Sequence, residues 1–177
     1  MDPSEIDFLV TQYGQPLYGF CRKLTFDVYD AEDLYQDTFL KAVELSKKID
    51  KNQNPQAWLF ALAVSLWQNK KRKYARRKRI APVVSITEEM SQLLAAEENL
   101  EDTVIEKELA DLVNVVVAQL DDNLRIPILL FYNAQMSVAE IALILQCPQG
   151  TVKSRLYKAR QTIKKELCAI TEVNADE

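Results

Sequence analysis

Histidine is absent from all 177 residues, and glycine occurs only three times, at Gly14, Gly19 and Gly150. Without histidine, neither a Ser-His-Asp or Cys-His catalytic group nor a histidine-ligated metal site can form. Three isolated glycines also exclude a phosphate-cradling loop and a dinucleotide-binding turn, because both need several glycines at close spacing. We therefore expect a protein that is not an enzyme and that uses no cofactor.

Paired cysteines and long apolar runs are missing as well. Cys21, Cys147 and Cys168 are scattered, with no C-x-x-C pair, so we expect thiols without zinc or redox chemistry. The longest nearly uncharged run, AWLFALAVSLW, is too short to span a bilayer core of about 30 Å. The N-terminus MDPSEIDF is acidic where a signal peptide would be basic, which predicts a cytoplasmic protein. The missing histidine and the scattered cysteines predict that it has no metal site.

Positive charge is concentrated in one block. The chain has a formal net charge of -4, yet the stretch KKRKYARRKR at 70–79 places eight cations in ten positions. The segment 82–103 instead carries many acids and no base. The net charge therefore hides a basic patch, of the kind that binds polyanions.

Apolar residues recur at helical spacing along most of the chain. The residues around 14–16 suggest a helix break, and Asp30 is a candidate N-cap for the following helix. Asn54 and Pro55 form a cap and first-turn pair for a third helix. This helix is apolar nearly all round over 58–67, so it should cross a core and then leave it as the basic block.

A second helical unit follows the acidic segment. We expect an all-α protein with two small helical domains, 1–81 and 104–177, joined by a flexible linker at 82–103. The stripe that should face the core of the second domain comprises Ile105, Leu109, Leu112, Val116 and Leu120.

The C-terminal domain contains a helix-turn-helix pattern. Ser137 and Glu140 fit a capping box for a short helix, Gln146 and Cys147 form a tight corner, and Pro148 restarts a helix. A buried seam on this second helix leaves a polar, cationic face suited to the major groove. The seam consists of Val152, Leu156, Ala159 and Ile163, and the other face of Gln149, Lys153, Tyr157 and Arg160, flanked by Ser154, Arg155 and Lys158. An ordinary helical hairpin with a solvated basic face remains the alternative.

Three segments, in this order, resemble parts of bacterial sigma-70 factors of the small extracytoplasmic-function (ECF) group. DAEDLYQDTFLKA resembles the helix that binds core RNA polymerase, and NPQAWLFALAVSLWQNKKRK resembles the promoter-melting helix. LDDNLRIPILLFYNAQMSVAEIALILQCPQGTVKSRLYKARQTI resembles the second DNA-reading domain. The resemblance covers most of the chain and implies a promoter-specificity subunit that recognises minus-ten and minus-thirty-five elements.

The resemblance also implies three sets of site residues. The first set, which would bind the clamp helices of the largest polymerase subunit, consists of Asp33, Gln36, Asp37, Leu40 and Lys41. For the minus-ten element and the upstream duplex they are Ser65, Gln68, Asn69, Lys70, Arg72, Lys73, Arg76 and Arg77. For the minus-thirty-five element they are Gln149, Thr151, Lys153, Ser154, Arg155, Tyr157, Lys158 and Arg160.

Several points stay open at this level. Many relatives carry arginine and asparagine where this chain has Ala61 and Ser65, so the usual contacts to the unpaired strand are in doubt, and Trp67 fits either core packing or base stacking. The resemblance implies control by an anti-sigma factor, which in this group is commonly anchored in a membrane. A stand-alone dimeric helix-turn-helix regulator and an RNA-binding adaptor are the alternative functions.

Overall fold

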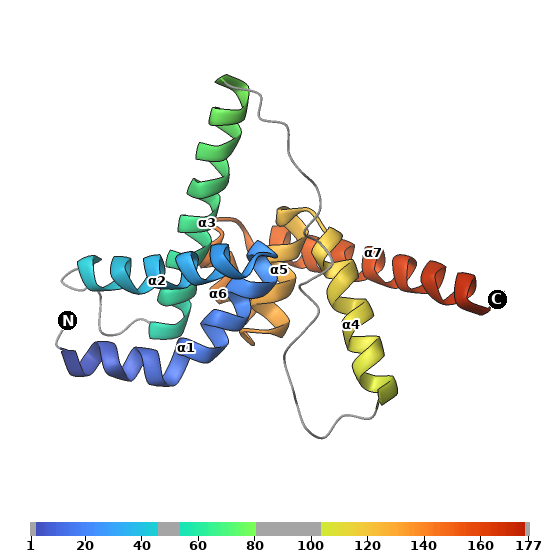
Figure 1. Ribbon diagram of the computed structural model, residues 1–177, viewed down its shortest axis with the longest axis horizontal. Helices are drawn as coiled ribbons and strands as arrows, with labels where there is room; N and C mark the ends of the chain where they lie inside the picture. Colours follow the sequence, from blue (N-terminus) through green and yellow to red (C-terminus); the bar gives the residue numbers. More distant parts are fainter. Residues whose placement is uncertain (1–2, 46–53, 81–103, 176–177) are drawn as a thin grey trace.

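The computed structural model describes residues 3–45, 54–80 and 104–175, and every regular element in these ranges is an α-helix (Figure 1). The all-α prediction is therefore confirmed for the described residues. The predicted linker at 82–103 lies outside them. The helices are α1 (Pro3–Thr25), α2 (Val28–Leu45), α3 (Pro55–Ile80), α4 (Val104–Gln119), α5 (Asp122–Tyr132), α6 (Val138–Ile144) and α7 (Gln149–Ala175).

Helix α1 is continuous, so the helix break expected around residues 14–16 is wrong. Pro16 lies inside α1, where its ring removes one backbone hydrogen bond without ending the helix. Figure 1 shows α1 changing direction partway along its length, as a proline in a helix produces. The bend lets the second half, with Leu17, Phe20 and Leu24, pack fully into the core.

The cap of α2 also differs from the prediction. The helix begins at Val28, and the Asp27 side chain accepts a hydrogen bond of 2.7 Å from the backbone N–H of Asp30. Asp27 is therefore the capping residue, while Asp30 lies in the first turn. Phe26, just before it, has a φ of 63°, a left-handed conformation that L-residues rarely adopt.

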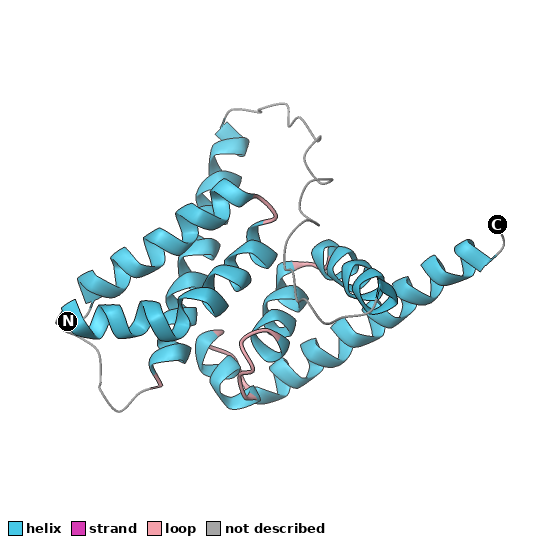
Figure 2. Cartoon of the chain, turned by 60° about the horizontal axis from the view of Figure 1, so that its bottom comes forward, coloured by secondary structure: helices cyan, strands magenta, loops and turns pink. Residues whose placement is uncertain are grey.

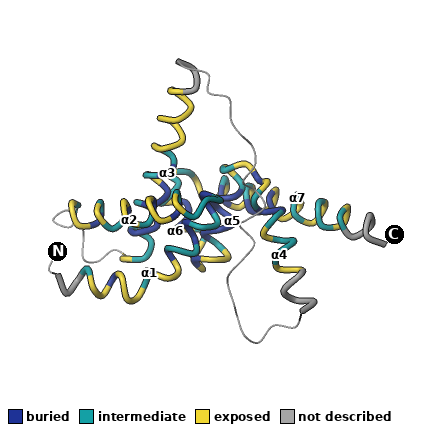
Figure 3. Tube along the Cα trace, in the orientation of Figure 1, coloured by how far each residue is buried: buried dark blue, intermediate teal, exposed yellow. Residues whose placement is uncertain are grey.

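Helix α3 begins as its sequence predicts. The Asn54 side chain accepts a hydrogen bond of 3.0 Å from the N–H of Gln56, and Pro55 occupies the first helical position. Leu59, Phe60 and Ala63 are fully buried. Beyond Gln68 the helix projects from the body of the protein and its side chains become exposed (Figures 1 and 3).

Helices α4 to α7 form the second unit, in which α5 and α6 both pack on α7. Its core contains Val116, Leu130, Ile141 and Val152, each almost inaccessible to solvent. Leu109, by contrast, is exposed, so the predicted inward stripe of α4 is wrong at that position. Leu112 is half-buried, Val116 is buried in the last turn of α4 and Leu120 is buried just after the helix ends, while the side chain of Ile105 lies outside the described residues.

The two helical units contact one another, which the sequence did not indicate. Figure 2 shows the unit that contains the N-terminus lying against the unit that contains the C-terminus. Gln56 donates its side-chain N–H to the carbonyl of Ala134 at 3.0 Å, and Asn54 donates to the Glu140 carboxylate at 2.6 Å. The contact therefore joins the start of α3 to the turn that precedes α6 and to the first turn of α6.

The centre of this contact is a buried arginine. The Arg125 guanidinium lies over the Phe26 ring, 4.3 Å from its centroid, and donates hydrogen bonds to the Asp122 carboxylate and the Ala118 carbonyl. Burial lowers the pKa of Arg125, an effect that Asp122 opposes. We refer to Phe26, Asp122 and Arg125, together with Lys71, which binds the same carboxylate at 2.7 Å, as the domain junction.

Candidate nucleic-acid interface and docking helix

The turn before α6 is fixed by the capping box that the sequence predicts. The Ser137 hydroxyl accepts from the N–H of Glu140, and the Glu140 carboxylate accepts from the Ser137 N–H at 2.8 Å. The hydrogen bonds from Ser137 are the main cause that lowers the pKa of Glu140 below its ordinary value. The corner after α6 is made by Gln146 at a φ of 50°, so α7 leaves in a new direction.

Replacing Ser137 by alanine should lower the free energy of unfolding by about 1 kcal/mol, the ordinary cost of losing an N-cap side chain. Urea titration measures this loss. The loss should be full at neutral pH and shrink in acid, because Glu140 supports the box only while it is ionised and its folded-state pKa is depressed.

Ser65→Ala is the matched control, since Ser65 lies exposed in the middle of α3, where alanine is a good helix former. An equal loss of stability in both variants would contradict a specific role for the Ser137 cap.

Helix α7 presents the cationic face that its sequence predicts. Val152, Leu156 and Ala159 are buried against the rest of the unit, so α7 is fixed by one side. Residues four apart in a helix are neighbours on its surface, which makes the outer side one continuous polar patch. We call this patch the reading face; its exposed members are Lys153, Ser154, Tyr157 and Lys158.

Other residues predicted for this interface lie apart from the reading face or beside it. Gln149 is exposed at the start of α7 and Thr151 is half-buried. Arg160 is exposed, and its Nε donates a hydrogen bond of 3.0 Å to the hydroxyl of Tyr132, a residue that sequence reasoning did not select.

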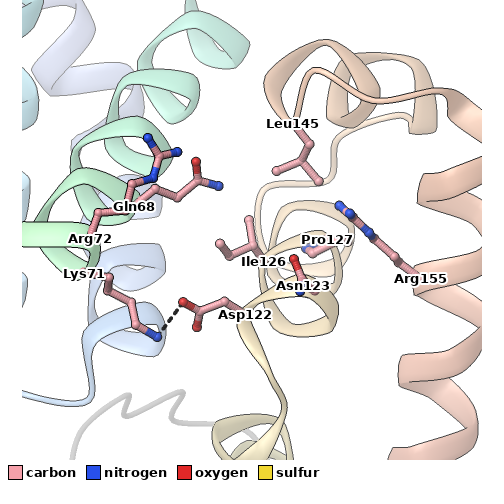
Figure 4. Close-up of a pocket in the computed structure, with 9 residues that line it drawn as sticks. All are labelled: Gln68, Lys71, Arg72, Asp122, Asn123, Ile126, Pro127, Leu145 and Arg155. Carbon is pink, nitrogen blue, oxygen red and sulfur yellow. Dashed lines mark hydrogen bonds and ion pairs between the residues drawn. The ribbon is translucent and has the colours of Figure 1, made fainter. Parts of the chain in front are cut away.

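Arg155 points away from the reading face, toward the first unit. Its half-buried side chain lines a cavity of about 310 Å³ between the units (Figure 4). Within the described part of the chain, no hydrogen bond or ion pair occupies Arg155. Its predicted role on the DNA backbone stays a prediction, and in this arrangement its side chain faces the other domain. The other residues around the cavity are Gln68, Lys71, Arg72, Asp122, Asn123, Ile126, Pro127 and Leu145.

The basic end of α3 has two kinds of cation. Lys70 binds Asp30 at 2.7 Å, and Lys71 binds Asp122 across the domain junction. A second group is exposed and makes no hydrogen bond or ion pair to any described residue. We call this group the basic extension; it consists of Arg72, Lys73, Arg76 and Arg77.

The preceding turns of α3 contain the residues predicted to meet an unpaired strand. Ser65 and Asn69 are exposed, and Gln68 is half-buried beside the cavity. Trp67, which the sequence left open, is 8% exposed and belongs to the core. In this arrangement its ring packs inside the protein, with the Lys71 ammonium 5.6 Å from its centroid.

Helix α2 carries a separate surface. Asp33, Gln36 and Asp37 are exposed, and Leu40 beside them is 63% exposed. Lys41 is half-buried and binds Glu44 at 2.7 Å. A leucine held in solvent between acids and an amide is a candidate protein contact.

Val43 adds to this surface. It follows Leu40 by three residues and is 44% exposed, so the two side chains adjoin on the helix. Val43 was not predicted from the sequence, although an apolar residue three positions after Leu40 is expected on the same face of a helix. We call Leu40 and Val43, with Asp33, Gln36 and Asp37, the docking face.

The cysteines take no part in these surfaces. Burial raises the pKa of Cys21 to about 12, which keeps this thiol protonated. Among the described residues, no group of three or more acidic or cysteine side chains is arranged to hold a metal ion. No described helix is both long and apolar enough to cross a membrane.

Two segments of the chain match known protein families. Residues 9–77 match the family Sigma-70 region 2, and residues 111–163 match the family Sigma-70, region 4. The chain is 31% identical over 162 residues to the ECF RNA polymerase sigma factor SigW of Bacillus subtilis, covering 90% of this chain and 87% of that protein. It is 30% identical over 165 residues to the ECF RNA polymerase sigma-E factor of Escherichia coli, covering 92% and 86%.

Two solved structures share the fold. One is the sigma factor RpoE bound to the anti-sigma factor NepR from Bartonella quintana, with a TM-score of 0.77 at 24% identity, covering 92% of this chain and 96% of that chain. The other is CnrH bound to the cytosolic domain of CnrY, with a TM-score of 0.66 at 23% identity, covering 93% and 88%.

Proposed function

Because this chain belongs to the extracytoplasmic-function group of sigma-70 factors, we propose that its two helical domains divide promoter recognition between them. The chain is a promoter-specificity subunit, which binds core RNA polymerase and directs the start of transcription, and it is not an enzyme. In the proposed division, residues 1–81 bind the polymerase and the minus-ten element. Residues 104–177 read the minus-thirty-five element, and 82–103 link the two.

The observation that carries this proposal is the reading face of α7. A helix held by its apolar side, with cations, a hydroxyl and a phenol on its free side, has the chemistry of a major-groove reader. The basic extension of α3 supplies cations without described partners, which suits phosphate contacts along the upstream duplex and the melted strand. The docking face of α2 is the proposed contact with the polymerase clamp helices.

Two further assignments follow from the relatives. RpoE and CnrH were solved with an anti-sigma factor and with the cytosolic domain of CnrY respectively, and we propose that this chain also has an anti-sigma partner. We place its action in the cytoplasm, where core polymerase and DNA meet. Membership of the sigma family decides against the stand-alone dimeric regulator and the RNA-binding adaptor.

Replacing Ser154 or Lys158 by alanine should change which upstream sequences support transcription, while affinity for core polymerase stays the same. A side chain that contacts a base edge contributes about 1 to 3 kcal/mol of discrimination between bases. The measurement is transcription by reconstituted holoenzyme from a promoter library with randomised upstream positions.

Lys165→Ala is the matched control, because Lys165 is exposed further along α7 and lies outside the reading face. Unchanged promoter preference and strength in both reading-face variants would show that these side chains only solvate a structural helix.

A further inference from the structure

Arg160 is held by an aromatic platform that nothing in the sequence pattern indicates. Its Nε donates to the Tyr132 hydroxyl at 3.0 Å. The guanidinium carbon lies 5.4 Å from the centroid of the Phe131 ring and 5.7 Å from that of Tyr132. These distances are within the range of cation–π attraction, so two kinds of interaction fix one side chain.

The platform itself is well supported. Phe131 and Tyr132 end α5, and their rings meet nearly edge to face, with centroids 5.1 Å apart and planes at 74°. Phe131 is half-buried and packs on the hydrophobic core, while Tyr132 is 55% exposed. One ring therefore anchors the pair and the other reaches the surface of the protein.

The two Nη groups of Arg160 remain available as hydrogen-bond donors for a ligand. Arginine has five N–H donors in a planar fork, and the bond to Tyr132 uses only the Nε donor. The two Nη groups make no hydrogen bond to any described residue, and together they match the oxygens of a phosphate. Arg160 follows Tyr157 by three residues and Lys153 by seven, so it lies on the same side of α7 as the reading face.

We propose that Tyr132 is a positioning residue for promoter recognition, which holds the Arg160 fork ready to grip a phosphate beside the minus-thirty-five element. A free arginine side chain loses rotamer freedom when it binds, and fixing it beforehand removes part of that loss. The inference rests on the proposed function of α7 and adds a residue from a different helix to it.

The test uses holoenzyme reconstituted from full-length chain and core polymerase, with duplex promoters that the wild-type holoenzyme selects from the randomised library. Tyr132→Phe keeps the ring and removes the hydroxyl, so affinity should fall about three- to tenfold, the usual effect of one hydrogen bond. Arg160→Ala should lower the promoter affinity further than Tyr132→Phe does. It should also lower the salt slope by about one unit, because one phosphate contact is lost. Tyr132→Phe should leave the slope unchanged.

A double variant separates positioning from mere stability. In the Arg160→Ala background, Tyr132→Phe should cause no further loss of promoter affinity, because its effect passes through the arginine. Tyr29→Phe is the matched control, since Tyr29 is an exposed tyrosine on α2, outside every proposed contact. Thermal unfolding of each variant shows whether the fold is intact.

Two results would overturn the inference: wild-type affinity in Tyr132→Phe, or additive losses in the double variant. Either would leave the proposed function standing. Failure of the wild-type holoenzyme to depend on any upstream sequence would instead reject the reading role of α7 itself.

Discussion

Replacing Leu40 by aspartate is expected to weaken binding to core RNA polymerase by at least 30-fold. A hot-spot side chain at the centre of a protein interface contributes about 2 kcal/mol or more, which corresponds to about that factor, and we expect Leu40 to have this role in the docking face. The aspartate would also place a third acid beside Asp33 and Asp37 and leave a charge in a desolvated contact. The measurement is the dissociation constant of a labelled chain titrated with core polymerase.

Two controls define the result. Leu40→Met keeps an apolar side chain of similar volume and should retain most of the affinity. Leu109→Asp introduces the same charge at an exposed leucine of α4, away from the docking face, and should bind normally. Because Leu40 is exposed, the aspartate variant should keep its unfolding midpoint, and normal polymerase binding by this variant would place the contact elsewhere.

Replacing all four residues of the basic extension by alanine should markedly lower the salt dependence of promoter binding. Each phosphate contact on duplex DNA contributes about 0.9 to the logarithmic salt slope, so four contacts contribute about 3.6. Between 50 and 200 mM salt, wild-type holoenzyme should therefore lose about 100-fold more affinity than the variant. Filter binding or fluorescence anisotropy over a salt series measures both slopes.

The matched variant places lysine at Arg72, Arg76 and Arg77 and so keeps every charge. It should retain the salt slope, because counterion release depends on charge rather than on the shape of the side chain. A wild-type slope in the alanine variant would show that the basic extension does not touch DNA in the initiation complex.

Local patterns in the sequence predicted the local structure well. The Asn54 cap of α3, the capping box at Ser137 and Glu140, and the turn at Gln146 all involve neighbours within a few residues. Their geometry depends on backbone rules that act over one helical turn. The exposed side of α7 followed from the same rules, since its buried seam has helical spacing.

Features set by distant contacts could not be predicted in this way. The direction of Arg155 depends on the cavity beside the other unit, and the burial of Trp67 depends on the core around it. The role of Tyr132 depends on an arginine 28 positions further along the chain. The cap of α2 could have been predicted from the sequence. An N-cap side chain accepts a hydrogen bond from the backbone N–H two or three residues later, and Asp27 stands three residues before Asp30.

The domain junction has a thermodynamic consequence for initiation. Elements named minus-ten and minus-thirty-five are about 25 base pairs apart, which is about 85 Å at about 3.4 Å per base pair. In this structure Arg72 and Arg155, one from each of the two domains proposed to read these elements, line the same cavity. With the proposed division of promoter recognition between the domains, both elements therefore cannot be engaged while the domains remain in contact.

The observed affinity for a promoter is then the intrinsic affinity multiplied by the fraction of molecules whose domains have parted. Each 1.4 kcal/mol of stabilisation that the junction provides lowers that fraction about tenfold, and a partner that binds only the parted form raises it again. On the proposed division of promoter recognition, the contact between Arg125 and Phe26 is therefore one of the interactions that set how many sigma molecules can engage both elements.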